Sequence, residues 1–484
     1  MNIKGVMMQF FEWYMPAGKH WTKMAEESAR LVEEGISALW IPPPYKGTDG
    51  LEDVGYAVYD RYDLGEFDQK GSVETRYGSK DELIRAIKTA HDHGLEIYAD
   101  IVLNHMMGAD SRELVEAEEF NPDNRHEKVS DLKRIEANTH FYFPGRQRKY
   151  SDFQWHWYHF TGIDYDQKKD QTAIFKFRGK YWEQQVDQEN GNYEYLMGAS
   201  LDLSRPEVRE ELKRWGKWFM ETTGIDGFRL DAIKHMEFAF YGEWLNEIRE
   251  FCRKECFTVG EYWSEHLDAL TNYLSTNEWA LSLFDVPLHS KFYQASKRGA
   301  DFDLRSLFEG TLTSENPLKS TTFVDNHDTQ PGQSLESWVE DWFKPLAYSV
   351  ILLRNEGYPC IFYGDYYGIE NNRIAPKKDM LRNLLSARIN RAHGERHDYV
   401  DDKNLIGWTC EGDDEHPGSG LAVLLTNSGP SEKQMMVGRR QAGAAFIDLM
   451  GGLKEPVTID EEGRGLFKVN GGSVSVWGRR DALK

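Results

Sequence analysis

The chain has 484 residues, of which 40% are hydrophobic, so it is long enough to bury more than one core and is not globally disordered. Its 58 basic and 80 acidic residues give a net charge of −22, which argues against nucleic acid or an anionic membrane as partner, because both need a clustered positive face. Aromatic residues make up 13% of the chain, a content that fills cores and also suits ligands with flat apolar faces.

The N-terminus carries no sign of an export signal. Residues 1–5 are not followed by the apolar run of a signal peptide, and no apolar stretch approaches the length needed to cross a bilayer. We therefore expect a cytoplasmic protein, although a secreted chain whose signal peptide had been removed would look the same. Four cysteines, Cys252, Cys256, Cys360 and Cys410, are too few for a disulfide framework and favour free thiols.

Short apolar runs alternate with longer helical patterns through most of the chain. The candidate strands are 6–11, 38–41, 96–103, 227–230, 257–260, 281–286, 321–324 and 359–363. The clearest candidate helices are 21–34, 79–93, 206–222 and 240–252. Ser204 before Pro206 predicts a capped helix start. This alternation is typical of a (β/α)8 TIM barrel, and no Gly-x-Gly-x-x-Gly motif follows the first strand to favour an open dinucleotide-binding sheet.

Two regions break the alternation. The segment after the third strand is rich in aromatic residues, charges and turns, and is too long for a loop, so we expect an inserted subdomain there. The last part of the chain has short strands with glycine turns, at 405–410, 421–426 and 472–477, which predict an antiparallel β-sandwich. The predicted α/β chain thus consists of a barrel (1–105 and 208–396), an insertion (106–207) and a C-terminal domain (397–484).

Polar residues follow several predicted strands, where a barrel places its reactive groups. They are Asp100, Asn104, His105, Arg229, Asp231, Glu261, Asn326, His327 and Asp328. Arg229 and Asp231 are two residues apart and so share a face of their strand, and a guanidinium there favours the ionised carboxylate that a nucleophile needs. Glu261 follows an apolar strand with no cation beside it in sequence, and poor solvation would raise its pKa as a general acid requires. Such a pair is typical of a retaining glycosidase.

A metal hydrolase is the main competing interpretation of the same residue types. Its candidate ligands are His91, His93, His156, His159 and His235. The sequence has no His-Glu-x-x-His motif and no paired cysteine spacing, and a lone histidine near a barrel rim is more often a hydrogen-bonding residue than a ligand. We therefore favour the glycosidase.

Four stretches at these strand ends resemble the signature regions of the α-amylase family of glycoside hydrolases. They are DIVLNH (100–105), GFRLDAIKH (227–235), GEYW (260–263) and FVDNHD (323–328). Further stretches, at 8–16, 40–43, 53–56, 150–158 and 325–337, are similar to the liquefying bacterial members of that family. The resemblance covers almost the whole chain, from Gly5 to Ser475.

The resemblance implies a role for each matched residue. Asp231 would be the nucleophile, Glu261 the acid/base, and Asp328 a third carboxylate that holds sugar hydroxyls. The implied substrate-binding residues are Trp13, Tyr14, Tyr56, His105, Arg229, Lys234, His235, Trp263 and His327. Among them, Arg229 would order Asp231, and Tyr56 would stack on the sugar whose bond breaks. His105 and His327 would bond that sugar, Trp13 and Tyr14 would stack on sugars at the rim, and Lys234, His235 and Trp263 would contact the leaving side.

The resemblance also implies calcium between the insertion and the barrel. Its ligands would be Asn104, Glu194 and the backbone carbonyl of His235. The liquefying relatives carry Asp where this chain has Glu183, Glu194, Ser200 and Ser204. Because serine is a weak, neutral ligand, we expect one calcium site, weakened at Ser200, in place of a multi-metal cluster, and Asp202 remains nearby.

The expected activity is endo-hydrolysis of α-1,4-glucosidic bonds in starch, glycogen or maltooligosaccharides, with retention of configuration, by a monomer. One alternative is a maltooligosaccharide-forming or transglycosylating member of the same family. A non-catalytic glucan-binding protein on the same fold is disfavoured, because Asp231, Glu261 and Asp328 all stand in their motifs.

Overall fold

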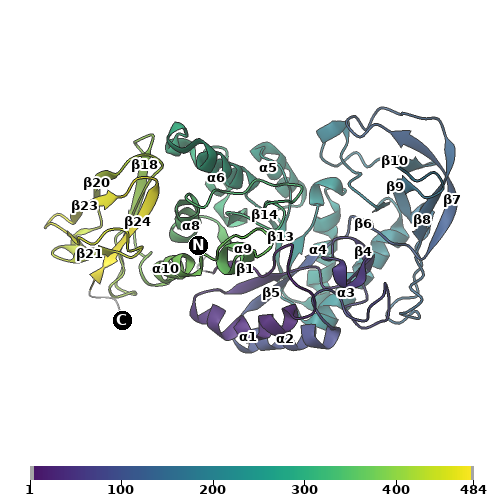
Figure 1. Cartoon of the computed structure of the whole chain (residues 1–484), viewed down its shortest axis with the longest axis horizontal. Coiled ribbons are helices and arrows are strands. Elements are labelled where there is room, and N and C mark those ends of the chain that lie inside the picture. The colour runs from purple at the N-terminus through teal and green to yellow at the C-terminus, as the bar shows by residue number, and fades with distance from the viewer. Residues whose placement is uncertain (1–4, 481–484) are drawn as a thin grey trace.

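The computed structural model describes residues 5–480, so residues 1–4, part of the segment considered for an export signal, lie outside it, as do residues 481–484. A closed barrel of eight parallel strands forms its centre (Figure 1). In chain order the strands are β1 (Met7–Gln9), β2 (Ala38–Ile41), β5 (Glu96–Ile101), β12 (Gly227–Leu230), β13 (Phe257–Gly260), β14 (Ser282–Phe284), β15 (Ser320–Phe323) and β16 (Tyr358–Phe362). Each strand pairs with the next, and β16 closes on β1, which confirms the predicted TIM barrel.

Barrel strands such as β2 and β16 are continuous apolar runs because both of their faces are covered. A glycine is needed where two of them meet most closely. A Cβ atom on Gly227 would lie 2.1 Å from the carbonyl oxygen of Phe257 on the neighbouring strand β13. Gly227 therefore lets β12 approach β13, and two residues later β12 presents Arg229.

Helices surround this barrel. They are α1 (His20–Glu33), α2 (Lys80–Asp92), α3 (Pro206–Thr223), α4 (Phe240–Cys252), α5 (Leu267–Thr276), α6 (Val286–Arg298), α7 (Leu312–Glu315), α8 (Lys344–Leu353), α9 (Tyr363–Tyr367) and α10 (Lys378–Asn390). Ser79 and Glu82 form a capping box at the start of α2. The predicted cap at Ser204 is wrong: Arg205 is the N-cap of α3, and the Ser204 hydroxyl donates to Asp202 instead.

A separate antiparallel sheet lies in the segment predicted as an insertion. Its strands are β6 (His105–Met106), β7 (Ser111–Phe120), β8 (Lys133–His140), β9 (Phe160–Asp166), β10 (Gln171–Phe177) and β11 (Ala199–Leu201), in the spatial order β6-β11-β9-β10-β7-β8. Its first and last strands pair with each other, with Ser200 opposite His105. The two chain ends of the inserted segment therefore lie together at the rim of the barrel, where β5 ends. A short hairpin of β3 (Lys46–Gly47) and β4 (Val58–Asp60) precedes it in the chain.

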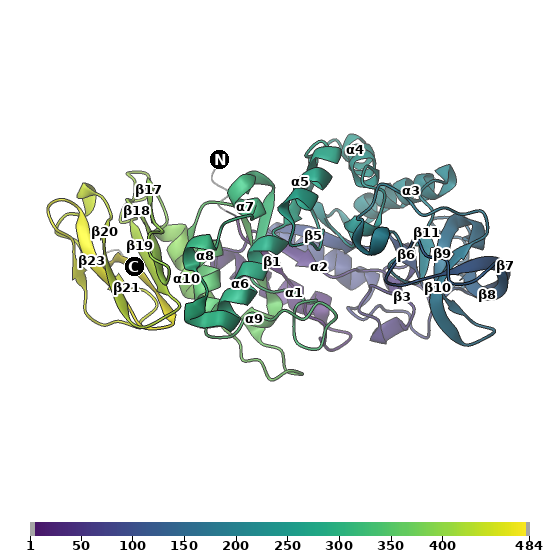
Figure 2. The same cartoon turned by 90° about the horizontal axis from the view of Figure 1, so that it is seen from above.

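The C-terminal part is antiparallel, as predicted. One sheet has the order β17 (Arg396–Tyr399), β18 (Leu405–Cys410), β19 (Leu421–Thr426), β24 (Ser473–Arg479), β21 (Ala445–Asp448) and β22 (Val457–Thr458), and β20 (Ser431–Met436) pairs with β23 (Arg464–Val469). Leu424, Phe446, Phe467 and Trp477 belong to a core of their own, which is the arrangement of a sandwich. Figure 2 shows these sheets at one end of the molecule, the inserted sheet at the other and the barrel between them.

Residues 5–480 also show the state of the cysteines and the character of the helices. All four cysteines are free thiols, and Cys256 lies beyond the end of α4. Across the described residues, no helix combines the length and the apolar character that a membrane span requires.

Candidate active site

A single buried arginine holds the carboxylates at the end of β12. The side chain of Arg229 is fully buried, and its Nη1 donates to Asp231 Oδ1 at 2.6 Å, as the two-residue spacing predicts. Nη1 also contacts both carboxylate oxygens of Asp100, at 2.9 and 3.1 Å. Nη2 lies 3.2 Å from Glu261 Oε2. Burial disfavours the charge of Arg229, but Asp100 and Asp231 outweigh burial and raise its pKa well above the ordinary value.

Asp100 is the residue of this group to which the sequence assigned no role. It lies directly opposite Arg229 in the parallel pairing of β5 with β12. Tyr56 Oη donates to Asp100 at 2.8 Å and Trp40 Nε1 donates at 3.1 Å. Asp100 and Asp231 therefore both hold the same guanidinium nitrogen, Nη1. The register of the two strands would have been the signal for this role.

Glu261 follows β13 and has the environment of a general acid. No cation lies beside Glu261 in the sequence, but in the folded chain Arg229 contacts Glu261. Burial nevertheless raises the pKa of Glu261 against the effect of Arg229, and the negative charge of Asp231 adds to the rise. The backbone N–H of Ala232 donates to Glu261 Oε2 at 3.1 Å, from a left-handed conformation with φ of 52°. The strained turn at Ala232, directly after Asp231, thereby connects Asp231 to the carboxylate of Glu261.

Asp328 and His327 lie in the turn after β15. The side-chain oxygen of Asn326 accepts the backbone N–H of Asp328 at 2.9 Å, which orients that turn. Burial, and then the charge of Glu261, raise the pKa of Asp328 well above the ordinary value. Burial lowers the pKa of His327 well below its ordinary value, so its ring is neutral. Gln9 Nε2 donates to His327 Nδ1 at 2.9 Å, which leaves the ring proton on Nε2, 3.2 Å from Asp328 Oδ2.

Three ring planes run parallel beside these carboxylates. The planes of Trp13 and Tyr56 differ by 4°, those of Tyr56 and His327 by 9°, and those of Trp13 and His327 by 8°. Tyr56 and His327 lie closest, with centroids 5.1 Å apart. Parallel aromatic faces of this kind suit the C–H face of a sugar ring. The structure therefore brings together three residues that the sequence placed in separate stretches.

Tyr14 and His105 make contacts with the loops that bear these rings. Gln333 Nε2 donates to the Tyr14 hydroxyl at 2.9 Å, which ties the loop after β1 to the loop that bears Asp328. His105 is buried, and its Nε2 donates to the backbone carbonyl of Tyr56 at 2.9 Å. In this structure His105 thus holds the Tyr56 loop in place.

Lys234, His235 and Trp263 lie where the barrel meets the inserted segment. Lys234 Nζ donates to the carbonyl of Trp263 at 3.1 Å and to Glu189 Oε2 at 2.8 Å. His235 Nδ1 donates to the carbonyl of Tyr193 at 2.6 Å, and burial lowers the pKa of its ring to about 3. Glu189 and Tyr193 therefore connect the inserted segment to the loops that follow β12 and β13.

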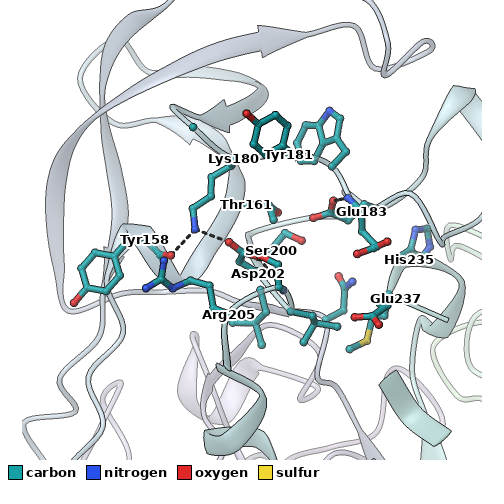
Figure 3. Close-up of a pocket in the computed structure, with 18 of the residues that line it drawn as sticks. Tyr158, Thr161, Lys180, Tyr181, Glu183, Ser200, Asp202, Arg205, His235 and Glu237 are labelled. Atoms are coloured by element: carbon teal, nitrogen blue, oxygen red, sulfur yellow. Dashed lines mark hydrogen bonds and ion pairs between the residues drawn. The ribbon is translucent and has the colours of Figure 1, made fainter. Parts of the chain in front are cut away.

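The three predicted metal ligands line one cavity of about 640 Å³ (Figure 3). Asn104, Glu194 and His235 face it together with Ser200 and Asp202. One carboxylate oxygen of Glu194 accepts the backbone N–H of Glu183, and the other is buried with no hydrogen-bond partner among residues 5–480. Burial raises the pKa of Glu194 to about 8. An unpaired, buried carboxylate oxygen beside amide and carbonyl oxygens is a donor set that fits calcium.

Asp202 differs from Glu194 in this cavity, because it already has a cation. Lys180 Nζ pairs with Asp202 and also donates to the carbonyl of Tyr158, and Figure 3 shows Lys180 reaching from one wall of the cavity to Asp202. Ser204 donates to the other oxygen of Asp202 through its backbone N–H at 3.0 Å. Among residues 5–480, in contrast, Glu194 has no such counter-charge.

Three of the histidines considered for a metal hydrolase have ordinary partners. His91 Nε2 contacts Asp226 at 2.8 Å, His156 Nδ1 contacts Glu113 at 3.1 Å, and His235 donates to a backbone carbonyl. These contacts favour hydrogen-bonding roles for the three residues.

Comparisons with known proteins show the family to which this chain is similar. A family model described as "Alpha amylase, catalytic domain" matches residues 30–411, and one described as "Alpha-amylase C-terminal" matches residues 421–478. The chain is 54% identical to an α-amylase of Geobacillus stearothermophilus over 98% of this chain and 87% of that one. It is 48% identical to a glucan 1,4-alpha-maltohexaosidase of Bacillus sp. (strain 707), over 98% and 92% of the two chains. It is 42% identical to a cytoplasmic α-amylase of Escherichia coli (strain K12), over 97% and 98%.

Proposed function

The chain belongs to the α-amylase family of glycoside hydrolases, and on this basis we propose that it hydrolyses internal α-1,4-glucosidic bonds with retention of configuration. The observation that carries the proposal is the guanidinium of Arg229, which lies 2.6 Å from Asp231 and 3.2 Å from Glu261. It places the two carboxylates side by side at one end of the barrel, next to the parallel rings of Trp13 and Tyr56. Starch, glycogen and maltooligosaccharides are the proposed substrates.

The proposed reaction has two steps. Glu261 gives its proton to the glycosidic oxygen while Asp231 attacks the anomeric carbon, so the carbon–oxygen bond breaks and a glycosyl ester of Asp231 forms. Glu261, now ionised, takes a proton from water, and the water oxygen displaces Asp231 from the same carbon. Two displacements restore the original configuration. The raised pKa of Glu261 supports the first role, because burial keeps its carboxyl protonated to higher pH.

The other site residues would hold the substrate. Asp328 and the Nε2–H of His327 would bond hydroxyls of the reacting sugar, and Tyr56 would stack on its ring. Lys234 and Trp263 would contact sugars on the leaving side, because both lie at the junction with the inserted segment. We also retain the predicted division into barrel, insertion (106–207) and C-terminal domain (397–484).

Two features of the relatives bear on the finer assignment. One relative is named for forming maltohexaose, which supports a maltooligosaccharide-forming enzyme as the alternative. Another is named cytoplasmic, which supports a cytoplasmic location for this chain. A monomer remains our prediction for the oligomeric state.

The product profile tests the endo mode. With soluble starch, iodine staining should fall early while few reducing ends have formed, because internal cleavage shortens long chains first. With maltoheptaose, several shorter products should appear together from the first time points. A single product from the start, with slow loss of iodine staining, would instead indicate an exo-acting enzyme.

We propose one calcium ion in the cavity between the inserted sheet and the barrel. Asn104, Glu194 and the backbone carbonyl of His235 would hold it, and calcium would supply the positive charge that Glu194 lacks. Ser200 is buried in the same wall and offers only a neutral oxygen, which supports a weakened site. Because Asn104 follows β5 and Glu194 comes from the inserted segment, the ion would join the two parts.

Removing calcium should lower the melting temperature. At a free calcium concentration of about 100 Kd, binding contributes about 2.7 kcal/mol, which corresponds to roughly 5 °C for a domain of this size. Differential scanning calorimetry with calcium and with a chelator measures the shift. Glu194→Gln should abolish the shift, whereas Glu127→Gln, which removes an exposed carboxylate of the inserted segment, should retain it. An equal shift in both variants would contradict a site at Glu194.

A further inference from the structure

The stretch 325–337 continues past Asp328 into residues to which neither the motif nor the proposed reaction gives a role. Thr329 follows Asp328 directly and is fully buried. Its hydroxyl donates to Asp325 Oδ1 at 2.7 Å and accepts the backbone N–H of Asn326 at 3.0 Å. The carbonyl oxygen of Asn326 lies farther from the hydroxyl, at 3.4 Å, so its proton goes to Asp325. Thr329 therefore fixes the two residues that open the turn.

Asn326 connects Thr329 to the backbone of Asp328. The side-chain oxygen of Asn326 accepts the backbone N–H groups of Asp328 and Thr329, both at 2.9 Å. The carbonyl oxygen of Asn326 accepts the backbone N–H of Gln330 at 3.2 Å, so the turn is closed from both sides. Because the Thr329 hydroxyl holds the N–H of the same asparagine, the position of Asp328 depends on a closed set of hydrogen bonds.

Asp325, which accepts the Thr329 proton, is itself held rigidly. Its Oδ2 accepts the backbone N–H of Val339 at 3.2 Å and pairs with Lys344 at the start of α8. The side chains of Asp325 and Lys344 are completely buried, and Lys344 Nζ also lies 2.8 Å from Asp365 in α9. Removing one partner of a buried ion pair is strongly destabilising, so this contact is a persistent one. The turn is thus attached to two helices through a fixed carboxyl group.

The loop that bears Trp13 is held by other bonds. The side-chain oxygen of Gln330 accepts the backbone N–H of Trp13 at 3.1 Å, and its Nε2 donates to Glu12 Oε2 at 3.1 Å. These bonds do not involve the Thr329 hydroxyl. Loss of that hydroxyl should therefore displace Asp328 more than it displaces the Trp13 ring.

We propose that Thr329 is a positioning residue for Asp328, because its hydroxyl attaches the turn to the buried carboxyl group of Asp325. Thr329 acts through Asp328 and does not touch the reacting atoms. The inference rests on the proposed hydrolysis of α-1,4-glucans, in which Asp328 bonds hydroxyls of the reacting sugar. Hydrogen bonds to that sugar strengthen in the transition state, so a displaced carboxylate should lower kcat.

Thr329→Val replaces the hydroxyl by a methyl group of similar size and tests the proposal. It leaves Asp325 Oδ1 and the Asn326 N–H without this partner. On soluble starch, kcat should fall by about 10–100-fold, the scale of a displacement of about 1 Å. KM should change by less than about threefold, because the sugar-binding rings remain in place. Thr329→Ser keeps the hydroxyl and should retain most of the rate.

Thr313→Val is the matched control for a general loss of stability. Thr313 is buried, and its hydroxyl also donates to a buried carboxyl group, that of Asp285. Asp285 accepts the backbone N–H of Leu288 at 3.0 Å and so holds the start of α6. Thr313→Val should lower the melting temperature to a similar extent as Thr329→Val and leave kcat at the wild-type value.

The Asp328→Asn background shows whether Thr329 acts through Asp328. Adding Thr329→Val to Asp328→Asn should lower kcat by less than about threefold, because residues that act as a unit have non-additive effects. An equal loss in both backgrounds would overturn the proposal. So would a folded Thr329→Val whose kcat stays within about threefold of the wild type, or a Thr329→Ser as slow as Thr329→Val.

Two further arrangements keep the test decisive. Thr329→Ala removes the same hydroxyl without placing a methyl group beside Asp325, and it replaces Thr329→Val in every comparison if the valine variant does not fold. A wild type that releases no reducing ends from starch would contradict the proposed function. Wild-type activity in Thr329→Val, measured beside an active wild type, contradicts the positioning role alone.

Discussion

Replacing Asp231 by Asn should lower kcat on soluble starch by about 10⁵-fold or more, the scale found when the nucleophile of a hydrolase is removed. The amide has almost the shape of the carboxylate but neither its charge nor its nucleophilicity, so the glycosyl ester cannot form. The loss should appear in kcat, because Trp13, Tyr56 and His327 remain in place to bind the sugar. Reducing-end release and the affinity for a non-hydrolysable maltooligosaccharide analogue measure the two effects separately.

The folded state should tolerate this change. Arg229 keeps its contacts of 2.9 Å with Asp100 and 3.2 Å with Glu261, so its buried charge is not left unpaired. We expect a change in melting temperature of only a few degrees, and full activity in Asp131→Asn, whose side chain is completely exposed. Activity within tenfold of the wild type in a folded Asp231→Asn would remove Asp231 from the mechanism.

The barrel was predictable because its strands are buried on both faces. Such strands appear as short apolar runs with polar residues directly after them, and residues 38–41, 227–230 and 257–260 match β2, β12 and β13 residue for residue. The strands of the insertion were not located, because one face of that sheet is exposed and its apolar residues are interrupted by charges. The strand β7, for example, is SRELVEAEEF, in which only Val115, Ala117 and Phe120 are buried.

Contacts across strands account for what the sequence did not reveal about the site. The parallel pairing that sets Asp100 opposite Arg229 joins residues 129 positions apart. The contact of Arg229 with Glu261 likewise depends on the register of β12 with β13, so proximity in sequence gave the wrong environment for Glu261. The motifs identified the residue types. Only the register of the barrel strands showed that the guanidinium of Arg229 contacts Asp100, Asp231 and Glu261.

The charges around Arg229 favour proton binding within this group of carboxyls. Asp100, Asp231 and Glu261 contact a single guanidinium, and Asp328 lies near enough for the charge of Glu261 to raise its pKa. One positive charge cannot compensate for four buried negative charges. Proton binding relieves the excess, and it is favoured at Glu261, Asp328 and Asp100, whose pKa values are raised. The same arginine therefore contacts both Asp231 and Glu261, while burial favours the protonated form of Glu261.

Replacing Glu261 by Gln should lower kcat on starch by about 10²–10⁴-fold, because the leaving oxygen no longer receives a proton. In the wild type, activity should fall as the pH rises through the pKa of Glu261, since a raised pKa keeps the acid protonated up to that point and no further. The variant should show no such alkaline loss. Glu265→Gln, which alters an exposed neighbour in the same loop, should retain both the rate and the pH profile of the wild type.

A substrate with an activated leaving group separates the two roles of Glu261. A nitrophenyl maltooligosaccharide needs no proton on its leaving oxygen, so Glu261→Gln should still form the ester with Asp231 and then stall, because no base deprotonates water. Azide needs no base, so it should restore turnover in Glu261→Gln and release a glycosyl azide of retained configuration. It should have no effect on Asp231→Asn, in which no ester forms. Rescue of Asp231→Asn but not of Glu261→Gln would exchange the two assignments.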